Sequence, residues 1–299
     1  MRAFLLLAIA IAVQDPVAMT GHTREVSSLA LSANGKLLAS GSVDLTVRLW
    51  DTAAKQSVAT LEGHDGEVQS LAFSPDGKLL ASGEMYKKVK IWDVESRKET
   101  QMYTVIEGNV QSLAFTPDGK RLFAACKDNL VRVWNVGSPA EAKKLPHNYA
   151  VNALALSPDG KTLATIDDDG SVHLWDATTL KKGKSMKHSN GGRAVAFSAD
   201  GKILASGGGD KVKLWDLASG TEKADAKAEA NAVAFTADGA TLVVGTQDNL
   251  VLFLSGTDLS LKFKGDKHER PVTAIAVSRD GKTAYSASMD YTIRTWSIR

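Results

Sequence analysis

The histidines are the side chains in this sequence best suited to chemistry, because imidazole can act as an acid, a base or a metal ligand near neutral pH. Five of the six recur at one position of a repeating unit, just ahead of a short apolar run: His22, His64, His147, His188 and His268. Catalysis and metal binding need several such groups to converge on one point. One histidine per unit spreads them apart instead, so we expect all five to be structural.

The remaining candidates for chemistry are weaker. Asp167, Asp168 and Asp169 form an acidic cluster, but a hard cation needs about six oxygen ligands in fixed geometry, which a single turn rarely supplies. His173 lies off the repeated position, inside an expected strand, where a half-exposed site is expected. No glycine-rich phosphate loop leads from a strand into a helix, and no nucleophile elbow is present. The sequence therefore predicts no catalytic residue, no metal site, no cofactor and no enzyme.

These residues are positioned by a unit that recurs seven times. The first copy runs from Gly21 to Asp51. Its terminal Trp50 is matched, at steps of 39 to 42 residues, by Trp92, Trp134, Trp175, Trp215, Leu254 and Trp296. All six tryptophans of the chain fall at this position, and no stretch is left over for a second domain.

Each copy has the pattern of four short antiparallel strands. In the second copy, an apolar run from Val68 to Phe73 ends in Ser-Pro-Asp-Gly, where Gly77 can adopt the positive φ of a tight hairpin. Two more strands follow, and a fourth precedes the next copy. One such sheet cannot bury both its faces, so the copies must stack, and radial stacking closes into a ring. Residues 221–230, TEKADAKAEA, favour helix, which predicts a poor or short outer strand in the fifth copy.

The Gly-His pair, the Ser/Thr-Pro-Asp-Gly-Lys hairpin and the Trp-Asp ending resemble the WD-repeat β-propellers. The resemblance covers Val17 to Arg299 and implies an all-β fold, a seven-bladed β-propeller of four-stranded antiparallel blades. The seventh copy lacks its fourth strand, whereas residues 15–20 precede the first copy as an outer strand would. We therefore predict that this N-terminal strand pairs with residues 292–298 and closes the ring, with Met19 in the position of Leu61.

In this family the repeated histidine belongs to a buried network with a turn Asp, a strand Ser or Thr, and the Trp indole. Carried onto this sequence, four copies hold the full set: His22, Ser40, Asp44 and Trp50; His147, Thr165, Asp169 and Trp175; His188, Ser206, Asp210 and Trp215; His268, Ser286, Asp290 and Trp296. A buried indole N–H and a buried hydroxyl must find partners, so a complete network would make each blade rigid.

The other copies depart from this set. Apolar residues replace several members together in the third copy (Ile106, Ala124) and in the sixth (Ala226, Val244, Leu254). Losing one partner costs about 1–3 kcal/mol, whereas losing several together can be nearly neutral. Asp128 and Asp248 remain in these copies and are expected to bond their own backbone. In the second copy Tyr86 takes the Asp position, and the sequence offers His64 no other carboxylate.

Charge is nearly balanced, with 36 basic and 34 acidic residues and a net charge of +2. This balance argues against a general binder of polyanions, so no specific nucleic acid is expected as a partner. Six hairpins place a lysine on one face: Lys36, Lys78, Lys120, Lys161, Lys202 and Lys282. We interpret them as solvated turn residues. The alternative, binding of nucleic acid or an anionic surface, would show steep salt dependence.

The N-terminus has its own composition. Residues 1–13, MRAFLLLAIAIAV, place one Arg before an apolar run of about ten residues, too short to span a bilayer. This fits a secretory signal peptide ending near Ala12, and the alternative is an apolar first element of the fold. Residues 14–299 are then one propeller domain, exported to the periplasm or medium if the signal is real and cytoplasmic otherwise. A monomer is expected, and Cys126, which can form no internal disulfide, should be buried.

The leading functional hypothesis is a non-catalytic scaffold that binds a protein or peptide across one face of the ring; the alternative is a propeller enzyme or cofactor binder acting at the central channel. The loops before the first strand and between the second and third strands share one face. Tyr, Met and Arg are enriched at interface cores. The predicted binding residues on that face are Arg24, Glu67, Met85, Tyr86, Tyr149, Arg270, Met289 and Tyr291.

Overall fold

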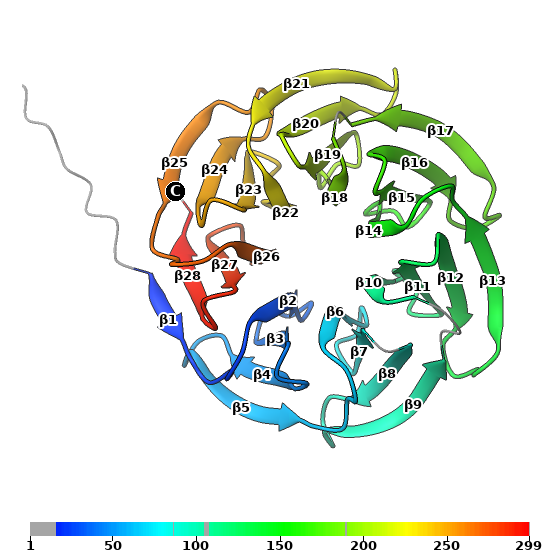
Figure 1. Cartoon of the computed structure of the whole chain (residues 1–299), viewed down its shortest axis with the longest axis vertical. Helices are drawn as coiled ribbons and strands as arrows, with labels where there is room; N and C mark the ends of the chain where they lie inside the picture. Colours follow the sequence, from blue (N-terminus) through cyan, green and yellow to red (C-terminus); the bar gives the residue numbers. More distant parts are fainter. Residues whose placement is uncertain (1–15, 86, 105–107, 189, 299) are drawn as a thin grey trace, which may run out of the picture.

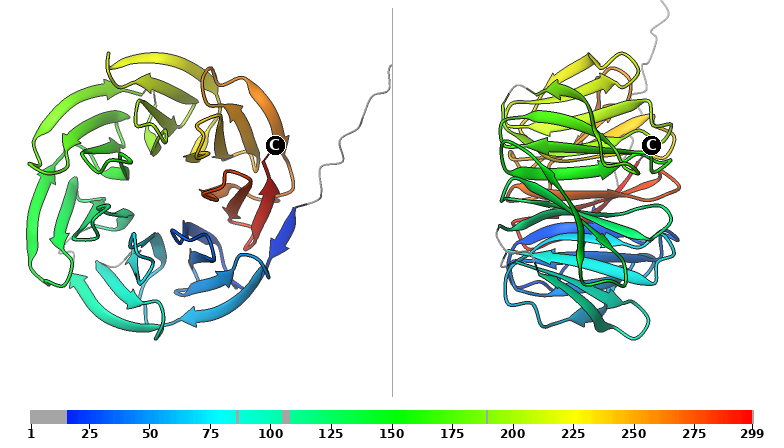
Figure 2. Two further views of the ribbon diagram at one scale, coloured as in Figure 1. Left: turned by 180° about the vertical axis from the view of Figure 1, so that it is seen from behind. Right: turned by 90° about the vertical axis from the view of Figure 1, so that its right-hand side faces the viewer.

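The computed structural model describes residues 16–85, 87–104, 108–188 and 190–298. Seven four-stranded antiparallel sheets stand as blades around a common axis (Figure 1). Seen from its edge, the ring is a thick disc with loops on two opposite faces (Figure 2). The predicted seven-bladed propeller is confirmed. Within the described residues, no helix has the length and apolar character needed to cross a bilayer.

Each blade consists of an inner, a second, a third and an outer strand. The seven strands of each kind belong, in the order of their naming, to blades 1 to 7. The inner strands are β2 (Val26–Leu31), β6 (Val68–Phe73), β10 (Val110–Phe115), β14 (Val151–Leu156), β18 (Gly192–Phe197), β22 (Ala230–Phe235) and β26 (Val272–Val277). The second strands are β3 (Leu37–Ser42), β7 (Leu79–Glu84), β11 (Arg121–Cys126), β15 (Thr162–Asp167), β19 (Ile203–Gly208), β23 (Thr241–Thr246) and β27 (Thr283–Ser288). The third strands are β4 (Val47–Asp51), β8 (Lys88–Asp93), β12 (Leu130–Asn135), β16 (Ser171–Asp176), β20 (Lys211–Asp216), β24 (Val251–Ser255) and β28 (Ile293–Ser297). The outer strands are β5 (Gln56–Leu61), β9 (Lys98–Thr104), β13 (Glu141–Pro146), β17 (Lys182–Lys187), β21 (Thr221–Lys227), β25 (Leu261–Gly265) and β1 (Val17–Met19).

The ring closes where the two ends of the chain meet. Strand β1 pairs antiparallel with β28, and Met19 lies opposite Ile293. Met19 is buried in the apolar cluster between blades 7 and 1. An edge strand with unpaired backbone groups is thereby covered, and the predicted closure is confirmed. The expected signal peptide, residues 1–13, lies outside the described residues.

The hydrophobic core of the described residues lies between blades rather than within them. Each apolar cluster joins two neighbours; between blades 1 and 2, for example, Val47 and Leu49 pack with Leu71 and Trp92. Close approach of the blades needs small residues, because a Cβ added to Gly41 would lie 2.6 Å from Val68 Cγ1. Cys126 is buried, as predicted.

The expectation of a poor outer strand in blade 5 is wrong. Strand β21 has seven residues and pairs with β20 along its length. Its alanines pack against the apolar cluster shared with blade 6, and Lys213 Nζ lies 2.7 Å from Glu222 Oε2. Pairing with an available strand edge, supported by cross-strand charge pairs, outweighs the helix preference of this segment.

The two faces carry different loops. One, here called the hairpin face, holds the turns between inner and second strands: residues 32–36, 74–78, 116–120, 157–161, 198–202, 236–240 and 278–282. The opposite one, here called the mouth face, holds the loops that enter each inner strand and those that leave each second strand. The seven predicted binding residues that the structure describes all belong to the mouth face.

Candidate binding site at the channel mouth

Every inner strand begins with a β-bulge at its second residue. The pairing with the second strand of the blade skips one residue there: Ser27, Gln69, Gln111, Asn152, Arg193, Asn231 and Thr273. The first residue of each inner strand is buried, and the bulge turns the polar side chain that follows it in a new direction. The result is a ring of seven polar side chains, one per blade, called here the bulge ring.

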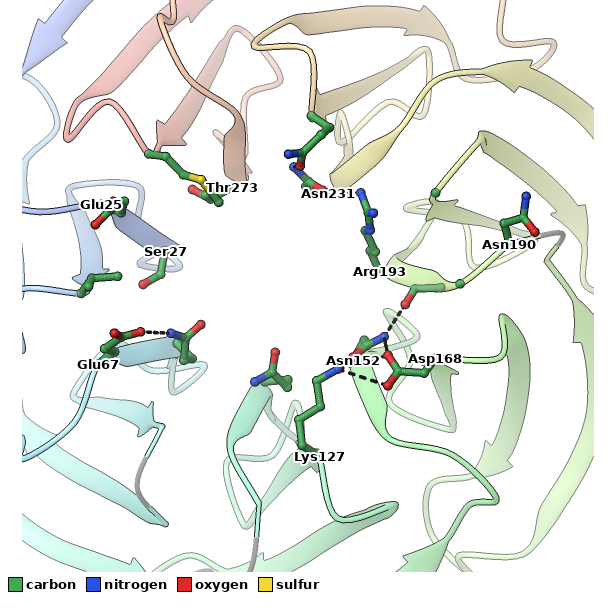
Figure 3. Close-up of a pocket in the computed structure, with 18 of the residues that line it drawn as sticks. Glu25, Ser27, Glu67, Lys127, Asn152, Asp168, Asn190, Arg193, Asn231 and Thr273 are labelled. Atoms are coloured by element: carbon green, nitrogen blue, oxygen red, sulfur yellow. Dashed lines mark hydrogen bonds and ion pairs between the residues drawn. The ribbon is translucent and has the colours of Figure 1, made fainter.

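The bulge ring lines a cavity of about 990 Å³ at the mouth of the central channel (Figure 3). The rim of this cavity adds residues from the loops of the mouth face: Arg24, Glu25, Val43, Glu67, Lys127, Asp168, Asn190, Gly191, Gly192, Gly209, Gln247 and Met289. Amide side chains and charges of both signs therefore surround one opening.

Part of the bulge ring fastens neighbouring blades together. Asn152 Nδ2 donates to the carbonyl of Gly192 at 2.6 Å, and Asn231 Nδ2 donates to that of Val272 at 3.0 Å. Thr273 Oγ1 donates to the carbonyl of Val26 at 2.5 Å across the ring closure. These bonds hold the polar wall in a fixed shape.

The charges at the mouth are only partly paired. Lys127 Nζ lies 3.1 Å from Asp168 Oδ1 and 2.6 Å from Asn152 Oδ1, so that cation is neutralised (Figure 3). Across the opening, Glu67 Oε2 accepts a hydrogen bond from Gln69 at 3.1 Å. Glu25 Oε1 lies 3.9 Å from a guanidinium nitrogen of Arg270.

Of the eight predicted binding residues, Arg24, Glu67 and Met289 line the cavity. Tyr149 and Tyr291 are exposed on the mouth face outside this lining, and the Arg270 guanidinium lies 5.7 Å from the centre of the Tyr291 ring. Met85 does not line the cavity, and Tyr86 lies outside the described residues. The sequence reasoning missed the bulge ring, although its signal is present: the second residue of the first strand is polar in all seven copies.

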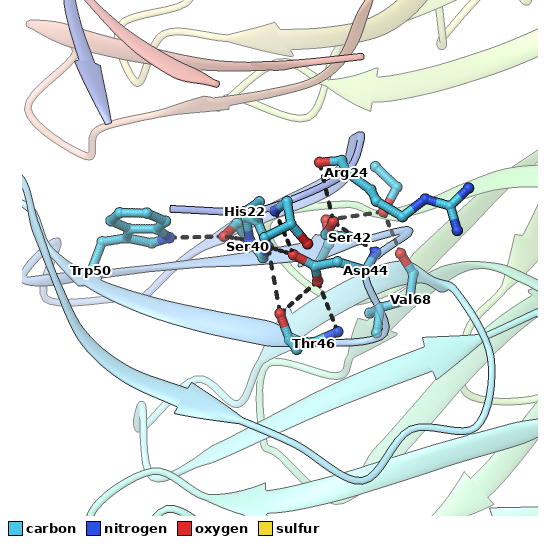
Figure 4. Close-up of polar contacts among 11 residues, drawn as sticks. His22, Arg24, Ser40, Ser42, Asp44, Thr46, Trp50 and Val68 are labelled. Atoms are coloured by element: carbon cyan, nitrogen blue, oxygen red, sulfur yellow. Dashed lines mark hydrogen bonds and ion pairs between the residues drawn. The ribbon is translucent and has the colours of Figure 1, made fainter. Parts of the chain in front are cut away.

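Beneath the mouth face, blades 1 and 7 contain the four-residue network expected from the family. In blade 1, His22 Nδ1 donates to Asp44 at 2.8 Å, His22 Nε2 lies 2.7 Å from Ser40 Oγ, and Trp50 donates to Ser40 at 2.8 Å (Figure 4). Burial by itself raises the pKa of Asp44, but hydrogen bonds from His22, from Thr46 and from a backbone amide outweigh it and hold the pKa well below its usual range. Blade 7 repeats this arrangement with His268, Ser286, Asp290 and Trp296.

Blade 2 supplies the carboxylate that the sequence analysis could not find. Glu84, the last residue of β7, accepts from His64 Nδ1 at 2.7 Å, and both side chains are fully buried. Ser82 Oγ joins His64 Nε2 at 2.6 Å and accepts from Trp92 at 2.7 Å. The acid therefore comes from the strand rather than from the turn.

Blade 4 differs from the expected network in its acid. Asp169 is not bonded to His147; it is an exposed residue paired with Lys187, and His147 Nδ1 donates to the carbonyl of Leu145 at 3.1 Å instead. Thr165 Oγ1 lies 2.8 Å from His147 Nε2 and accepts from Trp175 at 3.1 Å, as expected. Burial lowers the pKa of His147 to about 4.

The expectation that His173 is half-exposed is also wrong, because this residue is buried beside His147, with ring centres 5.3 Å apart. Its Nδ1 lies 2.8 Å from Ser185 Oγ, and its Nε2 lies 3.6 Å from the buried carboxylate of Asp167. Burial lowers the pKa of His173 as well. Asp167 thus holds the buried position in blade 4 that Glu84 holds in blade 2.

Blades 3, 5 and 6 show further variants. In blade 3, Asp128 accepts a bidentate pair of hydrogen bonds from Arg132, at 2.9 and 2.5 Å, a partner that the sequence analysis did not expect. Ile106 lies outside the described residues. In blade 5, Ser206 joins His188 and Trp215. Among the described residues, neither ring nitrogen of His188 bonds Asp210, and its buried Nε2 has no hydrogen-bond partner. In blade 6, the residue at the histidine position is Ala228 rather than Ala226. The backbone amide of Ala228 donates to the carbonyl of Asp210 in blade 5, just as the backbone amide of His188 donates to the carbonyl of Gly170 in blade 4.

The chemistry that the mouth can offer is recognition by hydrogen bonding and charge. Among the described residues, no group of three or more His, Cys, Asp and Glu side chains is placed to hold a metal ion. The amides of the bulge ring can both donate and accept, which suits the alternating N–H and C=O groups of a polypeptide. The fixed walls reduce the entropy lost when a ligand is bound.

A comparison with protein families matches most of the ring. The family model described as "WD40: WD domain, G-beta repeat" matches residues 15–51, 55–93, 100–135, 141–176, 182–216 and 259–297. These stretches cover well over half of the chain. The unmatched residues 217–258 include most of blade 6, in which the histidine, the strand hydroxyl and the tryptophan are all replaced.

A curated relative shares one short stretch with this chain. Protein Mut11 of Chlamydomonas reinhardtii is 51% identical over 43 residues, which are 14% of this chain and 12% of that protein. The chain therefore matches only about an eighth of the length of this relative, over a stretch about as long as one repeat.

Proposed function

Because the chain belongs to the WD40 repeat family, whose propellers typically act as protein-interaction scaffolds, we propose that it is a non-catalytic scaffold that binds a protein or peptide at the channel mouth. The observation that supports this most strongly is the bulge ring. Seven blades each direct one polar side chain into a single cavity, yet these seven positions hold five residue types: Ser, Thr, Asn, Gln and Arg. Repetition of the fold does not require this variety, whereas recognition of an asymmetric ligand does.

Exposed residues on the mouth face, around the cavity, provide contacts of the kind found at interface cores. Tyr149, Tyr291 and Met289 are 49%, 38% and 37% exposed on the mouth face. Large side chains of these types gain from burial against a partner, and they lose little conformational freedom when the ring beneath them is rigid. The polar cavity would then orient the partner, and these exposed side chains around it would contribute contact area.

The experiment compares the two faces by affinity capture from the source of the protein. The bait is the wild-type chain, a mouth variant (Gln111→Ala with Met289→Ala) or a hairpin-face control (Lys36→Ala with Lys202→Ala). We expect a partner to be captured by the wild type and by the control but not by the mouth variant. Loss with the control alone would move the site to the hairpin face. Single changes of Tyr149 and Tyr291 to Ala then test the exposed tyrosines around the cavity.

We propose further that the scaffold works as an exported monomer without nucleic acid. The composition of residues 1–13 and the nearly balanced charge support this. N-terminal sequencing of the protein purified from its source should find a start near Gln14, and light scattering should give the mass of one chain. A start at Met1, or affinity for nucleic acid that falls steeply with salt, would contradict this proposal.

A further inference from the structure

Arg193 is the one cation of the bulge ring, and its charge is not paired. The side chain is exposed at the mouth, and Nη1 donates to Asn231 Oδ1 at 3.0 Å. Within the part of the chain that the structure describes, Arg193 forms no ion pair. A guanidinium carries five N–H donors, so most of them stay available to a ligand.

The neighbouring amide holds Arg193 in place. Asn231 Nδ2 donates both to Gln247 Oε1 at 3.1 Å and to the carbonyl of Val272 at 3.0 Å. With its nitrogen engaged twice, Asn231 keeps its oxygen turned toward Arg193, on the same side of the opening (Figure 3). The guanidinium is therefore positioned before any ligand arrives, which lowers the entropy lost on binding.

Blade 5 contributes glycines to the lining of the cavity beside Arg193. Gly209 takes the rim position at which blades 3, 4 and 7 have Lys127, Asp168 and Met289. In each of these blades the backbone amide at this position donates to the carbonyl of the residue just before the inner strand, which in blade 5 is Gly191. Gly192 cannot carry a side chain, because an added Cβ would lie 2.0 Å from Ile166 Cγ1. Gly209 and Gly192 therefore bring no side chain to this part of the mouth, where Asn190 is the other lining side chain of blade 5.

The other cations at the mouth are differently placed. Lys127 is paired with Asp168, and Arg24 lies on the side of the opening that carries Glu25 and Glu67. We infer that Arg193 binds a carboxylate of the peptide partner, either an Asp or Glu side chain or a free C-terminus. This inference rests on the proposed function. Arginine meets carboxylate in a bidentate geometry, and one preorganised guanidinium in a mouth that also holds three carboxylates favours a monoanion over a doubly charged phosphate.

The test uses random peptides displayed with free C-termini and selected on the full chain, in wild-type form and as Arg193→Gln. We expect the peptides selected on wild type to share either an acidic residue at one position or a common sequence at the free C-terminus. The peptides selected on Arg193→Gln should lack that shared feature. One selected peptide is then synthesised in three forms: unchanged, with its acid replaced by the amide, and with an amidated C-terminus. The form that loses the recognised carboxylate should bind wild type roughly tenfold to a hundredfold more weakly, and this identifies the source of the carboxylate.

The controls separate this inference from the proposed function. Arg193→Lys should keep part of the preference, and Arg24→Gln, which removes the same charge from the other side of the mouth, should change the affinity less than Arg193→Gln. Removing the carboxylate from the peptide should change its affinity for Arg193→Gln little, because this variant has already lost the arginine that pairs with it. Peptides that need Gln111 but ignore both Arg193 and the carboxylate would overturn the inference and leave the proposed function standing. Failure of wild type to select any peptide would contradict both.

Discussion

On the hairpin face, all seven blades repeat one small network. An Asp or Asn side chain accepts from a Ser or Thr hydroxyl two residues before it and from the backbone amide two residues after it, as in Asn34, Asp76 and Asp238. On the mouth face, the seven positions of the bulge ring hold five residue types: Ser, Thr, Asn, Gln and Arg. The layer beneath it also varies, since the acid is Asp44 in blade 1 and Glu84 in blade 2. The hairpin face, whose polar residues stabilise a turn, is therefore nearly the same in every blade. The mouth face, which surrounds a cavity, varies among the blades.

This difference shows where the repeat constrains the sequence. A hairpin network satisfies its own polar groups within five residues, so any copy can use it unchanged. The mouth side buries polar groups drawn from loops and strands far apart in the sequence, and the set that satisfies them varies among the blades, although blades 1 and 7 share one. Because buried polar groups must be paired but the partners can vary, this half of the ring has the freedom to diverge. Stability should then reside in these buried sets, and binding in the bulge ring.

The largest effect on stability is expected in blade 2. Glu84→Ala leaves His64 without its acceptor and opens a buried cavity, so the free energy of unfolding should fall by about 3–5 kcal/mol. Urea denaturation measures it. As a matched control, Glu67→Ala removes a carboxylate at the mouth and should change stability by less than about 0.5 kcal/mol. Equal denaturation midpoints for the two variants would show that the buried acid does not matter.

The second prediction uses pH to separate the two faces. Burial lowers the pKa of His147 to about 4, so between pH 6.5 and 4 the unfolded chain binds a proton that the folded chain does not. The stability due to the neutral histidine is complete above pH 6.5 and should fall by about 3 kcal/mol as the pH drops to 4. His147→Gln should flatten this slope.

The hairpin acids respond in a different pH window. A hydrogen bond from Ser74 lowers the pKa of Asp76, and the equivalent acids of other blades behave alike. A carboxylate with a lowered pKa stabilises the fold above its unfolded value near 4, and that contribution is lost only as the pH falls further. An unchanged slope between pH 6.5 and 4 in His147→Gln would mean that other groups control the first window.

The third prediction compares a blade that has the network with one that has lost it. Trp175→Phe leaves the Thr165 hydroxyl without its indole donor, and we expect a loss of about 1–3 kcal/mol in the free energy of unfolding. Leu254→Trp in blade 6 should not stabilise the protein, because Val244 stands where a hydroxyl would receive the indole and the site is already filled. Thermal unfolding of both variants tests the pair, and a gain in stability from Leu254→Trp would contradict it.

The fourth prediction concerns a single hairpin. Asp76→Ala removes an acceptor for Ser74 Oγ at 2.6 Å and for the Lys78 amide at 3.0 Å. These bonds are near the surface, so the expected cost lies at the lower end of about 0.5–1.5 kcal/mol. Asp76→Asn is the matched control, since Asn34 does the same work in blade 1, and it should unfold like wild type. A control that loses as much as Asp76→Ala would show that the charge rather than the acceptor is needed.

The sequence predicted the ring because its strongest signals are repeated. A tryptophan at a near-constant step, a hairpin in every copy and the apolar Met19 ahead of the first copy each correspond to one contact that recurs around the fold. Blades 1 and 7 also contain the predicted networks. These elements could be predicted because a repeated position has a repeated environment.

The individual side of the molecule could not be predicted in the same way. Alignment placed Tyr86 and Asp169 at the turn position of the acid, but it carries no information on which neighbouring side chain faces the histidine. Glu84 and Asp167 lie two residues earlier, at the ends of their strands, where the pleat turns them inward. The bulge ring was missed for a related reason: a period-2 pattern assumes unbroken pairing, and the bulge reverses the direction of a polar residue that otherwise suits an ordinary strand.

The smallest effect on stability is expected from the bulge ring itself. Gln111 lines the cavity, and its side chain makes no hydrogen bond within the described residues. Gln111→Ala should therefore change the free energy of unfolding by less than about 0.5 kcal/mol, whereas affinity for a peptide selected on the mouth should fall. Asn152→Ala is the instructive neighbour, because it also breaks the bond to Gly192 between blades 4 and 5 and should lose both stability and affinity. Asp76→Ala, in contrast, should lose stability and keep its affinity. If Gln111→Ala binds the selected peptide as tightly as wild type while Asp76→Ala does not, the two faces have been assigned the wrong roles.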